Sequence, residues 1–107
     1  MKTIIIFNEE NNHLNEIVGG IYTGIDYKTA AAEIGENNIL YFIPLTISGR
    51  TYNERKNDLR NKAIEYQNSW YDFCGFSYGE LAIINDFFET NGRRYGLLTD
   101  FKENAIC

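Results

Sequence analysis

Residues able to perform catalysis are few in this chain and widely separated. His13 is the single histidine, and the two cysteines, Cys74 and Cys107, lie far from it in the sequence. Nucleophilic catalysis needs a base beside the nucleophile, and a zinc site needs several closely spaced ligands. Cys74 follows Phe73 and precedes Gly75, a setting typical of a small buried side chain. We therefore expect neither a Cys–His dyad nor a metal site.

Chemistry on sugars or phosphates has no better support. Glu9 and Glu10 form a carboxylate pair, but they lie in an Asn-rich segment that is typical of a solvated turn. The glycines at positions 19, 20 and 24 are not part of a Walker loop, because no Gly-Lys-Ser/Thr follows them. They also lack the third glycine of a dinucleotide-binding fingerprint. We expect a protein without enzymatic activity and without a cofactor.

Two groups of basic side chains are better suited to binding. The first is Arg93, Arg94 and Tyr95, which stand between glycines near an expected helix end. Two guanidinium groups and a phenol make a good anchor for the carboxylates or phosphates of a partner, and Arg and Tyr dominate binding hot spots. The alternative is a corner between two helices, in which one arginine pairs with a nearby acid and Tyr95 packs inward.

The second basic group lies on the first half of an expected helix over residues 50–73. Its members are Arg50, Arg55, Lys56, Arg60 and Lys62. With asparagines interleaved, such a face suits contacts with phosphates and base edges in a nucleic-acid groove. Glu54 and Asp58 interrupt it, so the alternative is a solvated helix face with local ion pairs.

The acidic balance of the chain bears on its partners and location. Fifteen acidic side chains against ten basic ones give a formal net charge of −5. This charge repels nucleic acids and anionic membranes at long range, so nucleic-acid binding is disfavoured and no membrane partner is expected. No run of about 18 apolar residues occurs, and the first residues are typical of a strand rather than a signal peptide. Together with two cysteines, this predicts a cytoplasmic protein.

Tyrosine is unusually frequent, with eight residues among 107. Eight tyrosines and one tryptophan cannot all be fully buried in so small a chain. A surface rich in Tyr with few Lys resembles a protein–protein interface. We expect partial exposure at Tyr22, Tyr27, Tyr41, Tyr52 and Tyr71.

Strand signals are concentrated in the first half of the chain. The expected elements are strands at residues 2–7, about 20–23 and 39–47, and a helix at 27–34. The first strand is a continuous apolar run, which predicts burial on both faces. Gly19 and Gly20 are expected to form the break before the second strand, and Asp26 to cap the helix. Pro44 favours an edge position or a bulge in the third strand.

Residues 50–73 carry the clearest helix signal. Apolar side chains recur there at spacings of seven, four and three, which places one stripe along a helix. Thr51 and Glu54 fit a capping box at its start. Asp58 and Lys62 are expected to form an ion pair one turn apart on its exposed side.

The remaining residues predict two more helices and, with them, the fold. Ser77 and Glu80 fit a second capping box. Asn91 and Gly92 are expected to end that helix, and residues 93–104 to form a short last one. Strands come first and helices later, which predicts an α+β fold in one compact domain over residues 1–107. A small antiparallel or mixed sheet from the N-terminal half would pack against two or three C-terminal helices.

We expect a non-enzymatic protein-interaction module. Its acidic, tyrosine-rich surface would occupy the basic cleft of a larger host protein that handles nucleic acid, as an anti-defence inhibitor encoded by a phage or mobile element would. Small size, many Asn and Ile residues and the scarcity of catalytic groups favour that origin. One alternative is a nucleic-acid-binding accessory protein that uses the Arg50–Lys62 helix, and another is a binder or hydrolase of a small nucleotide-like anion. A homodimer is also left open.

Overall fold

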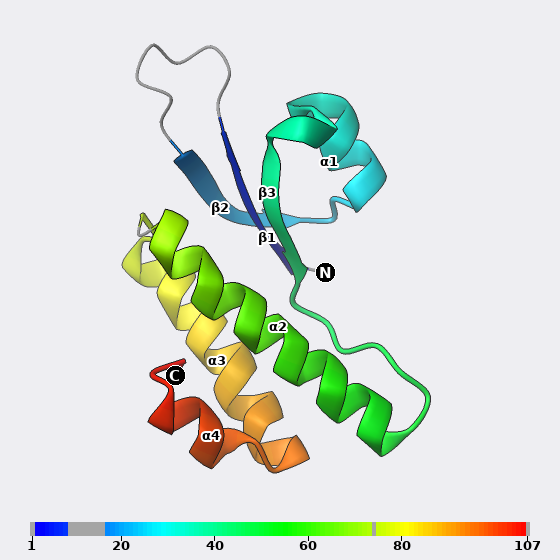
Figure 1. Ribbon diagram of the computed structural model, residues 1–107, viewed down its shortest axis with the longest axis vertical. Coiled ribbons are helices and arrows are strands. Elements are labelled where there is room, and N and C mark those ends of the chain that lie inside the picture. The colour runs from blue at the N-terminus through cyan, green and yellow to red at the C-terminus, as the bar shows by residue number, and fades with distance from the viewer. Residues whose placement is uncertain (1, 9–16, 74, 107) are drawn as a thin grey trace.

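The computed structural model describes residues 2–8, 17–73 and 75–106, and it shows a three-stranded sheet above a layer of helices (Figure 1). The elements are β1 (Lys2–Asn8), β2 (Ile17–Thr23), α1 (Tyr27–Ile34), the 3-10 helix η1 (Glu36–Asn38), β3 (Ile39–Pro44), α2 (Tyr52–Asp72), α3 (Tyr78–Tyr95) and α4 (Leu98–Glu103). The predicted α+β class is confirmed, and the sheet is antiparallel. The residues weighed for catalysis, Glu9, Glu10, His13, Cys74 and Cys107, lie outside the described ranges.

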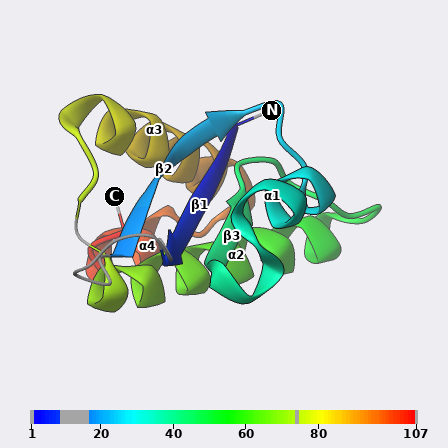
Figure 2. The same ribbon diagram turned by 90° about the horizontal axis from the view of Figure 1, so that it is seen from above.

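β1 is the central strand, because the sheet order is β2-β1-β3 (Figure 2). Ile4, Ile5 and Ile6 have no exposed surface. Ile4 and Ile6 belong to the core shared with the helices below. Ile5 faces the other way, where its cross-strand neighbour Phe42 contacts Tyr27 of α1 with ring centroids 5.4 Å apart. The strand is therefore covered on both faces, as predicted, and each buried isoleucine contributes about 1.5–3 kcal/mol.

Gly19 and Gly20 lie inside β2, so the predicted break at these residues is wrong. A Cβ on Gly19 would stand 2.8 Å from the carbonyl oxygen of Ile5, and one on Gly20 would stand 3.1 Å from the carboxylate of Glu80. The two glycines therefore provide space for close approach rather than freedom for a turn. β2 accordingly begins at Ile17, earlier than expected.

Glu80 ties the start of α3 to the outer edge of β2. Its Oε1 accepts a hydrogen bond from the backbone N–H of Ser77 at 3.0 Å, and its Oε2 accepts one from the backbone N–H of Ile21 at 3.0 Å. The bond from Ser77 lowers the pKa of Glu80, burial opposes this in part, and the bond from Ile21 lowers the pKa further. One carboxylate thus completes the predicted capping box and satisfies an edge amide of the sheet.

β3 is the other edge strand, and it ends at Pro44 rather than at residue 47 as expected. The N–H of Leu45 donates to the carbonyl of Lys2 at 2.8 Å. Since neighbouring residues of a strand alternate between its two sides, the backbone of Pro44 faces the outer edge, where a missing N–H costs no ladder bond. The predicted edge position is confirmed. The pairing with β1 skips Leu40, so the irregularity lies at the other end of the strand.

α2 and α3 run antiparallel beneath the sheet (Figure 1), and aromatic rings pack between them. Tyr66 of α2 stacks on Phe88 of α3, with centroids 5.4 Å apart and planes at 25°. Phe88 in turn meets Phe101 of α4 edge-on at 5.7 Å. The capping box of Thr51 and Glu54 is present at the start of α2, as predicted.

α3 passes through Gly92 and runs to Tyr95, so the predicted helix end at Gly92 is wrong. A Cβ on Gly92 would stand 2.8 Å from the ring of Phe101, which shows that glycine is needed there for the packing of α4. The helix ends instead at Gly96, which has a left-handed φ of 72°. The last helix consequently begins at Leu98 rather than at residue 93.

We expect Glu80→Gln to lower the free energy of unfolding by about 1–2 kcal/mol at pH 7, because a glutamine has only one oxygen for two amides. The folded pKa of Glu80 lies below its ordinary value of 4.5. The stabilising contribution is therefore present above that value and lost as the pH falls through the folded pKa. Urea unfolding from pH 7 towards pH 3 should show the difference from wild type shrinking. An equal loss in Glu65→Gln, an exposed site on α2, would contradict this assignment.

The same substitution at two glycines of α3 should have opposite effects. Gly92→Ala is expected to destabilise the fold by about 1–3 kcal/mol, because the new methyl group overlaps the buried ring of Phe101. Gly79→Ala meets no atom closer than 4.0 Å and should stabilise the helix by about 0.5–1 kcal/mol. Thermal unfolding of the two variants checks this. A gain in stability at Gly92 would show that the glycine is not needed for packing.

Candidate binding surfaces

Three arginines from the two predicted basic groups meet where α2 begins and α3 ends, at the lower end of the molecule in Figure 1. Arg50 directly precedes the N-cap of α2, Arg55 lies in the first turns of α2, and Arg94 comes from the last turn of α3. With Tyr52 they surround a hollow of about 470 Å³, hereafter the arginine corner. The full lining is Arg50, Thr51, Tyr52, Arg55, Arg94 and Tyr95. The lining therefore contains three guanidinium groups and no carboxylate.

Two tyrosine rings give the arginine corner a rigid base. Tyr95 is 4% exposed and packs inward, as the alternative for its triplet predicted. Tyr52 is 55% exposed, and its ring centroid lies 5.4 Å from that of Tyr95. The guanidinium carbon of Arg94 lies 5.9 Å from the Tyr95 ring centroid, within cation–π range. Arg55 Nε donates to the carbonyl of Gly49 at 3.0 Å. Both Arg94 and Arg55 therefore have defined supports.

Glu54 lies beside the arginine corner, but the backbone holds its carboxylate. Its Oε2 accepts from the N–H of Arg50 at 2.7 Å and from that of Thr51 at 3.2 Å. These two bonds, led by that from Arg50, lower the pKa of Glu54 and keep it ionised. The N–H of Glu54 donates to Thr51 Oγ1 at 3.2 Å. Thr51 and Glu54 thus cap the start of α2. The positive charge of the arginine corner comes from its three guanidinium groups.

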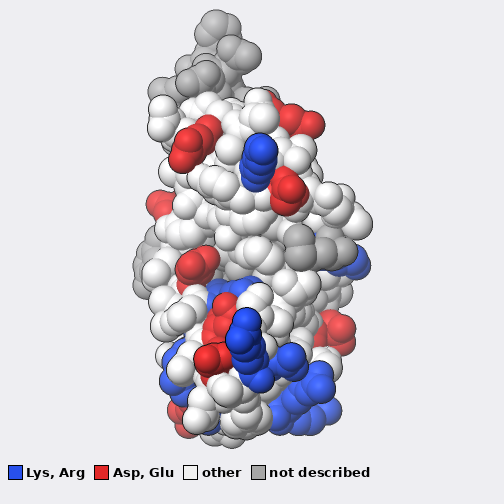
Figure 3. All heavy atoms as spheres, turned by 90° about the vertical axis from the view of Figure 1, so that its right-hand side faces the viewer, with Lys and Arg blue, Asp and Glu red and all other residues white. Residues whose placement is uncertain are grey.

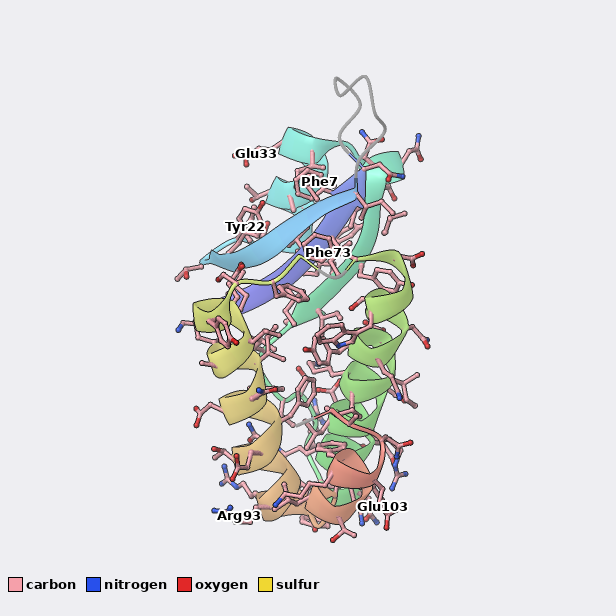
Figure 4. The ribbon with its side chains drawn as sticks, turned by 90° about the vertical axis from the view of Figure 1, so that its left-hand side faces the viewer. Phe7, Tyr22, Glu33, Phe73, Arg93 and Glu103 are labelled. Carbon is pink, nitrogen blue, oxygen red and sulfur yellow. The ribbon has the colours of Figure 1, made fainter. Side chains whose placement is uncertain are left out.

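The side chains of the predicted group Arg93, Arg94 and Tyr95 point in three different directions. Arg93 pairs with Glu89 at 3.2 Å, and both side chains are more than half exposed. Figure 4 shows Arg93 extending from the lower end of α3 into solvent. Arg94 lines the hollow, and Tyr95 packs into the core. Arg93 does not line the hollow and pairs with Glu89 instead, so it is not part of the arginine corner.

The other predicted basic residues on α2 do not form one surface. Lys62 pairs with Asp58 at 2.7 Å, which confirms that pair, but the Lys62 side chain is only 12% exposed rather than on an open face. Asp58 also accepts from the backbone N–H of Ser48 at 2.9 Å. Arg60 borders a separate hollow of about 270 Å³ between α2 and α4. Lys56 is half-buried. A continuous basic helix face is therefore absent among these residues.

The opposite end of the molecule is acidic. It comprises α1, η1 and the start of β3, and its exposed carboxylates are those of Asp26, Glu33 and Glu36. Two large apolar side chains are exposed among them, Tyr27 at 45% and Leu40 at 39%. These five residues are hereafter the acidic end. Figure 3 shows most of the basic side chains gathered at the lower end of the molecule, with acidic ones among them, whereas acidic side chains outnumber basic ones in the upper part. The molecule measures 44 Å along its longest axis, so the two surfaces are well separated.

The exposure of the tyrosines was largely predictable. Tyr22 and Tyr41 are partly exposed, as are Tyr27 and Tyr52, whereas the side chain of Tyr71 is not described. Tyr78 was missed, although it is 94% exposed. It lies six residues before Ile84 and ten before Phe88, spacings that place it off the apolar stripe of α3. This spacing is the feature of the sequence that predicts the exposure of Tyr78.

No protein-family model, curated protein or solved structure matches the chain. Within the described residues, no three His, Cys, Asp or Glu side chains come together as metal ligands. In the same part of the chain, no helix combines the length and the apolar character needed to cross a membrane.

Tyr41 links β3 to the end of α2, and its titration tests that link. Its hydroxyl donates to Asp72 Oδ2 at 2.7 Å, and this bond raises the pKa of Tyr41 above the ordinary 10.0. The contact therefore stabilises the fold below pH 10 and is lost as the pH rises through the folded pKa. In Asp72→Asn, NMR of the tyrosine rings should show the pKa of Tyr41 returning towards 10.0. The pKa of Tyr66, which burial raises, is the internal control and should not change.

Proposed function

We propose that the protein is a non-enzymatic binding module whose acidic end docks onto a basic surface of a larger protein. The observation that carries this proposal is the grouping of exposed Tyr27 and Leu40 with three exposed carboxylates. Neither of the two ion pairs among the described residues involves these carboxylates. The three carboxylates outnumber Lys28, the exposed lysine of α1. Exposed apolar side chains rimmed by polar ones mark protein-interaction sites.

The expected partner is a protein with a basic cleft for nucleic acid. The carboxylates of Asp26 and Glu33 lie at the start of α1 and within it, and that of Glu36 lies on η1. They can take the place of phosphates in such a cleft, and their charge speeds the encounter. The Tyr27 ring is held edge-on against Phe42, so its position is set before binding. This supports a blocking role for the protein. Its encoding by a phage or mobile element and its place in the cytoplasm stay predictions from composition.

Recognition of a nucleic-acid groove by the whole basic half of α2 is the weaker alternative. Lys62 is held by Asp58, and Glu54 stands between Arg50 and Arg55 in the sequence. Its positive charge is thus broken up along the helix. The part that stays together is the arginine corner, which requires α3 as well as α2.

A capture experiment with matched charge variants tests the acidic end. Tagged protein is incubated with lysate of the native host, with and without nuclease treatment, and retained proteins are identified by mass spectrometry. We expect a stoichiometric partner whose affinity falls about tenfold in Glu33→Lys/Glu36→Lys, because both carboxylates would then repel a basic surface. The control, Glu65→Lys/Glu103→Lys, makes the same change in net charge at exposed sites on α2 and α4.

Two results would contradict the proposal. Equal loss in both double variants would show that only net charge matters and that the acidic end has no special role. Loss of the partner on nuclease treatment would show that a nucleic acid, rather than the acidic end, mediates the contact. Binding that weakens with salt but survives nuclease agrees with the proposal.

A further inference from the structure

We propose that the arginine corner binds a nucleoside phosphate, with the phosphate on the guanidinium groups and the base on the ring of Tyr52. This goes beyond the proposed function, because it concerns the opposite end of the molecule and a different kind of ligand. The inference rests on charge, on an available aromatic face and on the rigidity of both.

The positive charge of the hollow favours binding of an anion. Arg50, Arg55 and Arg94 line it without a carboxylate, and none of them takes part in the two ion pairs of the described residues. Arg55 uses only Nε for the carbonyl of Gly49, which leaves its outer nitrogens for a ligand. Guanidinium groups bind phosphate oxygens in pairs, so three of them suit a phosphate better than a single lysine would.

The exposed ring of Tyr52 favours stacking of a planar group beside that anion. Tyr52 rests against buried Tyr95 at 5.4 Å, yet 55% of its surface is exposed. One side of the ring is therefore supported and the other is accessible. Bases stack on such rings with little regard to sequence, and a phosphate attached to the base would reach the arginines beside it.

Structural roles at the helix ends do not account for the three arginines of the corner. The start of α2 is already capped by Thr51 and Glu54, so the arginines are not needed there. Arg94 lies in the last turn of α3, where a cation favours the helix dipole, but Arg93 already supplies one in the same turn. Neither role explains why Arg50 and Arg55 converge on Arg94 around an exposed tyrosine.

Amide NMR with thymidine compounds tests the site. The ligands are thymidine 5′-monophosphate, unphosphorylated thymidine, pyrophosphate and a 5′-phosphorylated hexathymidylate. We expect the monophosphate to shift amides of residues 49–56 and 94–96, and thymidine alone to leave them unchanged. The dissociation constant should rise about tenfold in Arg94→Gln and about tenfold in Tyr52→Leu. Arg93→Gln, with the same loss of charge one residue away, should change it less than twofold.

The outcomes separate the source of the ligand from failure of the idea. Much tighter binding of the hexathymidylate than of the monophosphate assigns the site to single-stranded nucleic acid, and equal binding assigns it to a free nucleotide. Absence of shifts at these residues at millimolar ligand would overturn the proposal. Equal effects of Arg93→Gln and Arg94→Gln on the dissociation constant would also overturn it. So would pyrophosphate binding as tightly as the monophosphate, together with an unchanged dissociation constant in Tyr52→Leu. Tighter binding of a hexaglutamate peptide would assign the corner to an acidic protein instead.

Discussion

The stacking of Tyr66 on Phe88 is the contact on which both candidate surfaces depend. Neither ring is more than 1% exposed, and together they hold α2 and α3 in one register. At the lower end that register brings Arg55 to the same hollow as Arg94. At the upper end it supports the sheet from which the acidic end projects. A slip of one helical turn, about 5.4 Å, would separate the arginines without unfolding either helix.

Local signals predicted the helix starts well, because a capping box is complete within four residues. Thr51 and Ser77 begin α2 and α3 as expected. Glycines were misinterpreted, because a glycine that frees the backbone and one that only vacates space look alike in a sequence. Gly19 and Gly92 are of the second kind, and their neighbours come from β1 and α4. Such a requirement becomes visible only when the elements are packed.

The candidate site was predictable in its parts but not in its assembly. Arginines near both helix ends were recognised by type, yet their meeting depends on two segments about 40 residues apart in the chain. A helix that ends at Gly92 would leave Arg93 and Arg94 together beyond its end, so the sequence predicts one binding unit there. Once α3 is known to pass through Gly92, the rotation of about 100° per residue sends the two side chains to different sides. The acidic end was foreseen only as a general surface property.

The two edges of the sheet have a consequence for the behaviour of the protein at high concentration. The run Ile4–Ile6 is apolar and β-branched, the composition of segments that stack into fibrils when they are exposed. Here it occupies the central strand, with β2 on one side and β3 on the other. Glu80 occupies an amide of β2, and a bulge and Pro44 interrupt β3. A strand from another molecule finds no regular row of donors and acceptors to extend, so the folded sheet is a poor template for amyloid growth.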